Sequence, residues 1–175
     1  MGVGWTEVIV DLSFEHLDLV VSASRLVCPA TGLDGPGVVG VRDGLIEFIE
    51  MGAGGIEHLT AHESLVVEDG ILLPGLIDLH AHPAVSGSKF GIDADRDLLP
   101  KGSTTVLSQG DAGSRNLDRY IEETIRGSRT RVKLAVNFCA EGDSNPEGRF
   151  LSLDEANIDE CVAAVDRGGD DVWGI

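Results

Sequence analysis

The chain has 175 residues, and its 30 acidic side chains outnumber its 13 basic ones, which gives a formal net charge of −17 at pH 7. So negative a surface argues against nucleic acid or an anionic membrane as a partner. With 42% hydrophobic residues and no apolar run near the ~18 residues that a membrane span needs, the composition is that of a soluble globular protein.

The cysteines indicate a reducing compartment. Cys28, Cys139 and Cys161 are widely spaced and odd in number, so they suggest no disulfide framework. No secretory signal is visible, because the first basic residue is Arg25. We therefore expect a cytoplasmic protein.

The N-terminal part of the chain predicts short strands that are separated by turns. An apolar stretch within residues 16–27 predicts the first strand and Val38 to Val41 the second. Asp43-Gly44 is a strong hairpin signal, after which Leu45 to Ile49 forms the returning strand. This segment therefore has the pattern of an antiparallel sheet.

A second hairpin signal, Asp69-Gly70, separates Ser64 to Val67 from Ile71 to Leu73. Turn residues that recur about every 8 to 12 positions suggest a small all-β unit, which we place in residues 1–68. We expect no catalytic group there. His58 and His62 are four residues apart, but the zincin order is absent, so we interpret both as solvated loop histidines.

Two histidines stand at the end of the next apolar run. Residues 74–82 read P-G-L-I-D-L-H-A-H, and Pro83 follows. Side chains of a strand alternate between its faces, so His80 and His82 are expected to share one face, with Ala81 on the other. An isolated pair of this kind can be two solvated histidines in a loop. Because this pair ends a strand that looks buried, we interpret it as a pair of metal ligands.

After His82 the pattern changes to alternating strands and helices. The expected elements are a helix at 93–99, a strand at 103–108, a helix at 115–126 capped by Ser114, a strand at 131–139, a helix at 153–167 and a strand at 171–175. The last helix is expected to bury Ile158, Cys161, Val162 and Val165 on one face and to end at Gly168-Gly169. Such crossovers build a parallel sheet, so residues 69–175 are predicted to form an α/β domain.

Further polar residues follow the strand ends, where a parallel barrel gathers its function. Asp78 precedes His80 by two residues and so shares its face, where it can support the metal ligands or hold the strand end. Gln109, Asp111 and Asn137 can line the pocket. Each also has a purely structural alternative, as a helix cap or a hydrogen-bonding loop residue.

The run at residues 74–82 resembles the first barrel strand of the amidohydrolase superfamily, whose pattern is P-G-x-I-D-x-H-x-H. The resemblance implies a TIM-type (β/α)8 barrel, of which about the first four strands are present, with a small N-terminal β-sandwich. It also implies one or two divalent metals, zinc first, with manganese, iron or cobalt as alternatives. The phrases K-G-S-T-T-V, S-R-T-R-V and W-G-I resemble the deacetylase-like branch more than the dihydroorotases.

The resemblance implies an enzyme that cleaves the C–N bond of an N-acyl amino acid or cyclic amide, or a related acyl ester, by attack of metal-bound hydroxide. Its partner is then a small-molecule substrate, and we further expect a homo-oligomer. The alternative is a non-catalytic, hydantoinase-like barrel that acts as an assembly protein. The presence of both His80 and His82 favours catalysis, because a scaffold does not need them.

A complete barrel needs about 250 residues, so we expect the protein to continue beyond Ile175. The family's remaining ligands are a carboxylated lysine or its substitute, two further histidines and an aspartate that acts as the general base. All of them are expected on that continuation.

Overall fold

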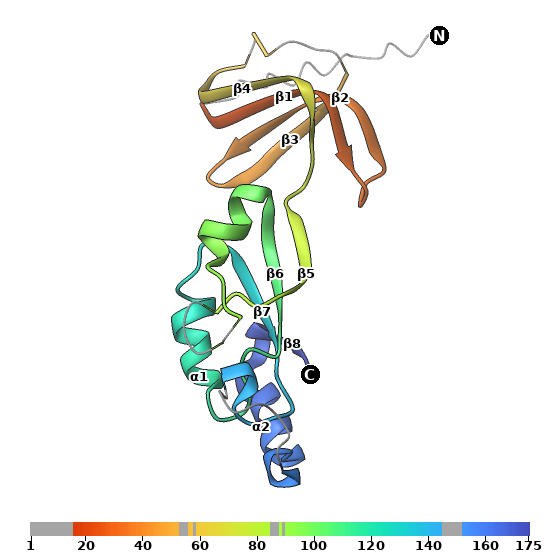
Figure 1. The fold of residues 1–175 in the computed structure, drawn as a ribbon. Helices are drawn as coiled ribbons and strands as arrows, with labels where there is room; N and C mark the ends of the chain where they lie inside the picture. The colour runs from red at the N-terminus through yellow and green to blue at the C-terminus, as the bar shows by residue number, and fades with distance from the viewer. Residues whose placement is uncertain (1–15, 53–55, 58, 85–87, 89, 145–151) are drawn as a thin grey trace, which may run out of the picture. The chain divides into compact units, whose positions relative to one another are not determined.

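The computed structural model describes residues 16–52, 56–57, 59–84, 88, 90–144 and 152–175. They belong to two compact units, Met1–Pro74 and Gly75–Ile175, which we call the N-terminal and C-terminal units (Figure 1). None of the helices in the described part of the chain combines the length and the hydropathy needed to cross a bilayer.

The N-terminal unit contains a four-stranded sheet in the order β3-β2-β1-β4. Its strands are β1 (Leu17–Cys28), β2 (Leu33–Arg42), β3 (Leu45–Met51) and β4 (Ala61–Leu72). β2 pairs antiparallel with both β1 and β3, whereas β4 runs parallel to β1. The hairpin predicted at Asp43-Gly44 is confirmed, because both residues have the positive φ angles, 51° and 74°, that a two-residue hairpin turn requires.

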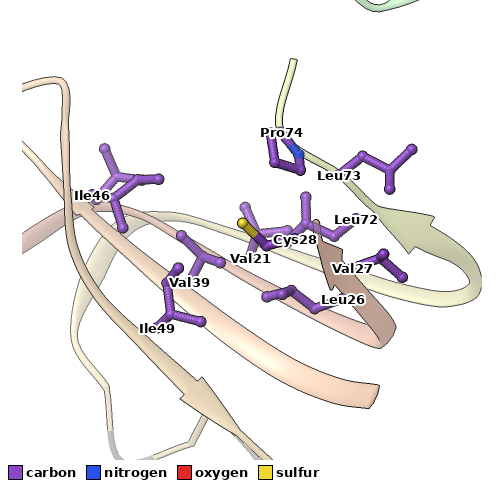
Figure 2. Close-up of a pocket in the computed structure, with 11 residues that line it drawn as sticks. Val21, Leu26, Val27, Cys28, Val39, Ile46, Ile49, Leu72, Leu73 and Pro74 are labelled. Carbon is purple, nitrogen blue, oxygen red and sulfur yellow. The ribbon is translucent and has the colours of Figure 1, made fainter. Parts of the chain in front are cut away.

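The two faces of this sheet are both apolar. Leu17, Val20 and Val38 are buried in a small core, against which Phe48 packs. The next residues along the strands, Val21 and Val39, point to the opposite face. They line a groove of about 260 Å³ (Figure 2). The residues that line this groove are Val21, Leu26, Val27, Cys28, Val39, Val41, Ile46, Ile49, Leu72, Leu73 and Pro74.

The second predicted hairpin is wrong, because β4 continues through Asp69-Gly70 to Leu72. It stays paired with β1, and the register shifts where Ala23 and Arg25 face Val67 and Ile71. The intervening residues are therefore taken up as a bulge. The expected domain boundary between residues 68 and 69 falls inside this strand, whereas the two units divide after Pro74. The described residues of the N-terminal unit form a single sheet, so the second layer of a β-sandwich stays a prediction.

The C-terminal unit contains a parallel sheet whose four strands follow chain order, β5-β6-β7-β8. The strands are β5 (Leu76–Ala81), β6 (Ser103–Gln109), β7 (Arg131–Ala135) and β8 (Val172–Gly174). The α-helices are α1 (Leu117–Tyr120) and α2 (Ile158–Gly168) (Figure 1). Short π and 3-10 segments span Ala94–Leu98, Leu99–Lys101, Ile121–Ile125, Gly142–Ser144, Leu153–Glu155 and Gly169–Asp171.

The predicted alternation of strands and helices is thus confirmed, as part of a barrel. Its core joins both helices to the sheet and comprises Ala84, Ala112, Leu117, Tyr120, Ile121, Leu134, Val136, Cys161 and Ala164. β5 differs from the prediction, since Leu76, Ile77 and Leu79 are exposed rather than buried. Within the described part of the chain β5 is the first strand of its sheet and has β6 as its one neighbour.

The helix ends also differ from the sequence prediction. Ser114 does not cap the first helix: its hydroxyl donates to Glu160, and α1 begins only after Asn116. α2 starts at Ile158, later than predicted, where the side chain of Asn157 accepts a hydrogen bond from the backbone N–H of Glu160. This later start leaves Leu153 outside the α-helix.

The buried face of α2 is narrower than the predicted one. Cys161 and Ala164 are buried, as is Gly168, whereas Ile158 is 65% exposed and Val162 half exposed. A Cβ atom on Gly168 would lie only 2.3 Å from a Val172 methyl carbon, so small residues let the helix approach the sheet. The close fit of small residues, and not hydrophobicity alone, therefore determines which face of α2 packs against the sheet.

Candidate metal centre

His80 and His82 lie where β5 ends, and their rings are neighbours. The ring centroids are 5.6 Å apart in an edge-to-face arrangement. Ala81, between them, is buried and faces Ser108 of β6 in the strand register. His80 is exposed and the side chain of His82 is 25% exposed, so both rings are open to a ligand.

The backbone around His82 is fixed by hydrogen bonds. Its carbonyl oxygen accepts from the N–H groups of Ala84 and Ile92, at 2.9 and 3.0 Å. The ring of Phe90 lies 5.7 Å from the His82 ring, centroid to centroid. Ala84 and Ile92 therefore hold the backbone of this residue, and Phe90 limits where its ring can turn.

Asp111, from the end of β6, contacts the inner side of His82. Its Oδ1 atom lies 3.0 Å from Nδ1 of the imidazole, and its Oδ2 atom accepts a hydrogen bond of 2.7 Å from the hydroxyl of Ser108. Asp111 is only 1% exposed and Ser108 is fully buried. A carboxylate with two partners in so dry a place is rigidly held.

A second carboxylate, Asp143, reaches the same ring nitrogen from the loop after β7. Its Oδ2 atom lies 3.5 Å from Nδ1 of His82, and its backbone N–H donates to the carbonyl of Gly110. Gly142, with φ at +60°, makes this approach possible, because a Cβ atom there would lie 2.6 Å from the Asp111 carbonyl oxygen. One ligand atom each from His82, Asp111 and Asp143 lies within 4.8 Å of the others.

The sequence prediction missed Asp143. The available signal was its place in a Gly-Asp-Ser turn that follows a parallel strand. That turn lies at the carboxyl end of the sheet, as the histidines do. Parallel strand ends meet at one edge, so acidic residues in all their following loops are candidates.

Tyr120 of α1 adds a hydroxyl to this buried region. Burial raises the pKa of Tyr120 well above its ordinary range, and the negative charge of Asp111 raises it further. The phenol therefore stays protonated and neutral beside the carboxylate.

Three other predicted residues hold the backbone rather than join this cluster. Asp78 accepts a hydrogen bond of 3.0 Å from the N–H of His80 through its side chain. The Gln109 amide donates to the carbonyl of Leu79, at 2.8 Å, and so ties β6 to the end of β5. Asn137 donates to the carbonyl of Gly110 and accepts from the N–H of Cys139.

The histidines of the N-terminal unit have a different setting. His62 lies in β4 rather than in a loop, because the strand already begins at Ala61. It is exposed, and its ring stacks on that of His16 at 5.7 Å. His58 lies outside the described residues.

No family model matches the chain. In sequence it is similar to a deacetylase from Brucella anthropi, with 32% identity over 96 residues, which covers 52% of this chain and 24% of that protein. It is also similar to adenine deaminase 2 from Rhizobium etli, with 28% identity over 156 residues, 87% of this chain and 26% of that protein. The chain thus spans about a quarter of the length of these curated relatives.

Solved structures share the fold. A dihydroorotase superimposes with a TM-score of 0.73 at 21% identity, over 90% of this chain and 41% of its own. The N-acyl-D-glutamate deacylase of Bordetella bronchiseptica, complexed with zinc and a phosphonate inhibitor, gives a TM-score of 0.54 at 20% identity, over 71% of this chain and 30% of its own.

Proposed function

We propose, from the premise that this chain belongs to the amidohydrolase superfamily, that the protein hydrolyses a C–N bond of a small-molecule amide with a divalent metal held by His80 and His82. One observation carries the proposal. The two imidazoles lie side by side at the carboxyl end of β5, within the run P-G-L-I-D-L-H-A-H. That end of a parallel barrel strand is where catalytic groups gather.

The donor set fits a transition metal. Neutral imidazole suits zinc, iron and related divalent ions, and zinc is the first expectation, with manganese, iron or cobalt as alternatives. When bound, such an ion supplies a Lewis acid for the substrate carbonyl and an activated water at neutral pH. The exposure of both rings leaves room for further ligands and for substrate.

The chain's own residues set the positions of the two rings. The hydrogen bond from the His80 N–H to the Asp78 side chain holds the backbone that carries the first ring. The bond from Gln109 to Leu79 holds the end of β5 against β6 where the strand register is irregular. We expect the other metal ligands and the general base to come from other strands of a closed eight-stranded barrel.

The relatives named deacetylase, deacylase and dihydroorotase support a proposal for the class of substrate. We expect an N-acyl amino acid, a cyclic amide or a related acyl ester. A hydrolysis screen over acyl-amino acids, hydantoins and dihydroorotate, with zinc or manganese, tests this. Turnover of phosphoesters alone would contradict it.

The metal proposal is tested by replacing each histidine with alanine. We expect the purified protein to hold zinc, and His80→Ala and His82→Ala each to weaken zinc binding by about 100-fold or more, because a ligand is lost. Metal content by mass spectrometry and affinity by chelator competition measure this. His62→Ala is the control, since that exposed histidine lies in the N-terminal unit. A folded protein without metal would contradict the proposal and favour the assembly role.

A further inference from the structure

We propose that Ser108 and Asp111 form a buried positioning pair that fixes the tautomer and orientation of His82, with Asp143 as a second carboxylate on the same ring nitrogen. The inference rests on the proposed function in one respect, because it takes His82 as a metal ligand. It deepens that function by assigning roles to three residues that surround the ligand.

The two oxygen atoms of Asp111 have separate partners. Oδ2 accepts from the Ser108 hydroxyl at 2.7 Å, which leaves Oδ1 to face Nδ1 of His82 at 3.0 Å. An ionised carboxylate only accepts hydrogen bonds, so the proton of this contact belongs to Nδ1. A neutral imidazole with its proton on Nδ1 carries its lone pair on Nε2, and that atom is then the metal donor.

Burial makes this arrangement strong. Asp111 and Ser108 are removed from solvent, whereas the His82 side chain keeps 25% of its exposure. A charge-assisted hydrogen bond gains strength where water cannot compete for either partner. The imidazole is therefore held from its inner side, while part of it remains open to solvent.

Asp143 reinforces the same choice of tautomer. Its Oδ2 atom lies 3.5 Å from Nδ1, and the residue is only 2% exposed. A second negative charge beside Nδ1 favours a proton on that nitrogen over a lone pair. A carboxylate next to a metal-bound histidine also raises the basicity of the ring as a ligand.

The competing arrangement is a cation held directly between His82, Asp111 and Asp143, whose ligand atoms are close enough for it. It would place the metal on Nδ1. The 3.0 Å separation from Asp111 is a direct hydrogen-bond distance, so the structure favours the positioning role.

The first test measures zinc affinity by chelator competition in the purified protein. We expect Asp111→Asn to weaken zinc binding by about 10- to 100-fold, the usual effect of removing such a partner. Ser108→Ala, which removes one hydrogen bond to the carboxylate, is expected to weaken it by about three- to tenfold. In the double variant the two effects should not add, because Ser108 acts through Asp111. Asp143→Asn should have a smaller effect than Asp111→Asn.

Two matched variants control for loss of stability. Asp95→Asn makes the same change at a carboxylate that binds the backbone between the Ile121–Ile125 segment and β7. Ser128→Ala removes a hydroxyl that donates to the Thr124 carbonyl. Both are expected to leave zinc affinity unchanged. Unchanged affinity in Asp111→Asn, or an equal loss in Asp95→Asn, would overturn the inference.

The second test reads the tautomer directly. Long-range ¹⁵N–¹H spectra of histidine-labelled protein should show His82 protonated at Nδ1, with zinc on Nε2, and a mixture of tautomers in metal-free Asp111→Asn. Zinc on Nδ1 would overturn the positioning role in favour of the three-residue cation site. Wild-type protein that binds no zinc would instead overturn the proposed function, so the two failures are distinguishable.

Discussion

Asp95 ties a helical segment to the start of a strand. Its Oδ1 atom accepts from the N–H of Thr130, at 2.7 Å, and from the Thr130 hydroxyl, and its Oδ2 atom accepts from the N–H of Arg129. These bonds hold the ionised form, above all the one from the Thr130 side chain, and lower the pKa of Asp95 below its ordinary value. The residue thus connects the Ala94–Leu98 segment to the beginning of β7.

We predict that Asp95→Asn lowers the free energy of unfolding by about 1–3 kcal/mol at pH 7, the range for hydrogen bonds to a charged group. A lowered pKa in the folded state means that the stabilisation is present above the unfolded value of about 3.9 and is lost as pH falls through the folded value. Urea unfolding of both proteins at pH 7 and near pH 3 measures the difference. A difference that stays constant with pH would contradict this origin.

At the scale of the element, the fit of α2 against the sheet depends on two small side chains. Ala164 is fully buried and Cys161 nearly so, whereas Ala163 beside them is exposed. Burial raises the pKa of the Cys161 thiol, which therefore packs as a neutral group. Replacing the buried Ala164 with a larger residue thus tests how closely this helix packs against the core.

We predict that Ala164→Leu lowers the free energy of unfolding by about 1–3 kcal/mol, because extra methylene groups overpack a filled core. Ala163→Leu, the same change one residue away, should alter it by less than about 0.5 kcal/mol. Chemical denaturation of the two variants makes the comparison. Equal effects would show that α2 presents a different face to the sheet.

The elements differ in how well their sequences predict them. The strand β6 and the turn at Asp43-Gly44 were predictable, because a β-branched run and positive-φ residues act locally. The continuation of β4 was not, since it depends on pairing with β1 along its whole length. Local hairpin chemistry at Asp69-Gly70 was outweighed by that non-local pairing.

In the candidate site, too, local sequence predicts some features, whereas others depend on non-local contacts. The spacing of His80 and His82 along one strand predicted that their rings would be neighbours. The approach of Asp143 depends on contacts between two loops, in which Gly142 and Gly113 pack without side chains against backbone from the other loop. Contacts of this kind have no periodic signature, so the sequence pattern does not contain them.

At the scale of the whole molecule, charge repulsion opposes folding. The 30 acidic side chains outnumber the 13 basic ones, so one-to-one ion pairing cannot neutralise the net charge of −17. The ion pairs of Arg25 with Asp34, Arg96 with Asp97 and Arg119 with Glu123 are all solvent-exposed. Exposed pairs contribute little each, so we expect the general repulsion to outweigh them.

We predict that raising NaCl from about 0.02 to about 0.5 M increases the midpoint of thermal unfolding by a few degrees, since salt screens repulsion among exposed charges. Thermal scans followed by circular dichroism measure the shift. KCl at equal ionic strength should reproduce it, because screening does not depend on which cation is used. A lower midpoint in salt would show that attractive pairs dominate.

Cys28 lines the groove of the N-terminal sheet and differs from the other two cysteines in its exposure. Cys28 is partly exposed at the end of β1, and the Thr31 hydroxyl lowers its pKa, whereas Cys139 and Cys161 are buried. A maleimide or spin label applied near neutral pH would therefore attach at Cys28 first, because the thiolate is the reactive form and must be accessible. Cys28 is thus a natural attachment site for a spin label. From it, the distance to a paramagnetic ion bound at His80 and His82 could be measured without engineering a new cysteine.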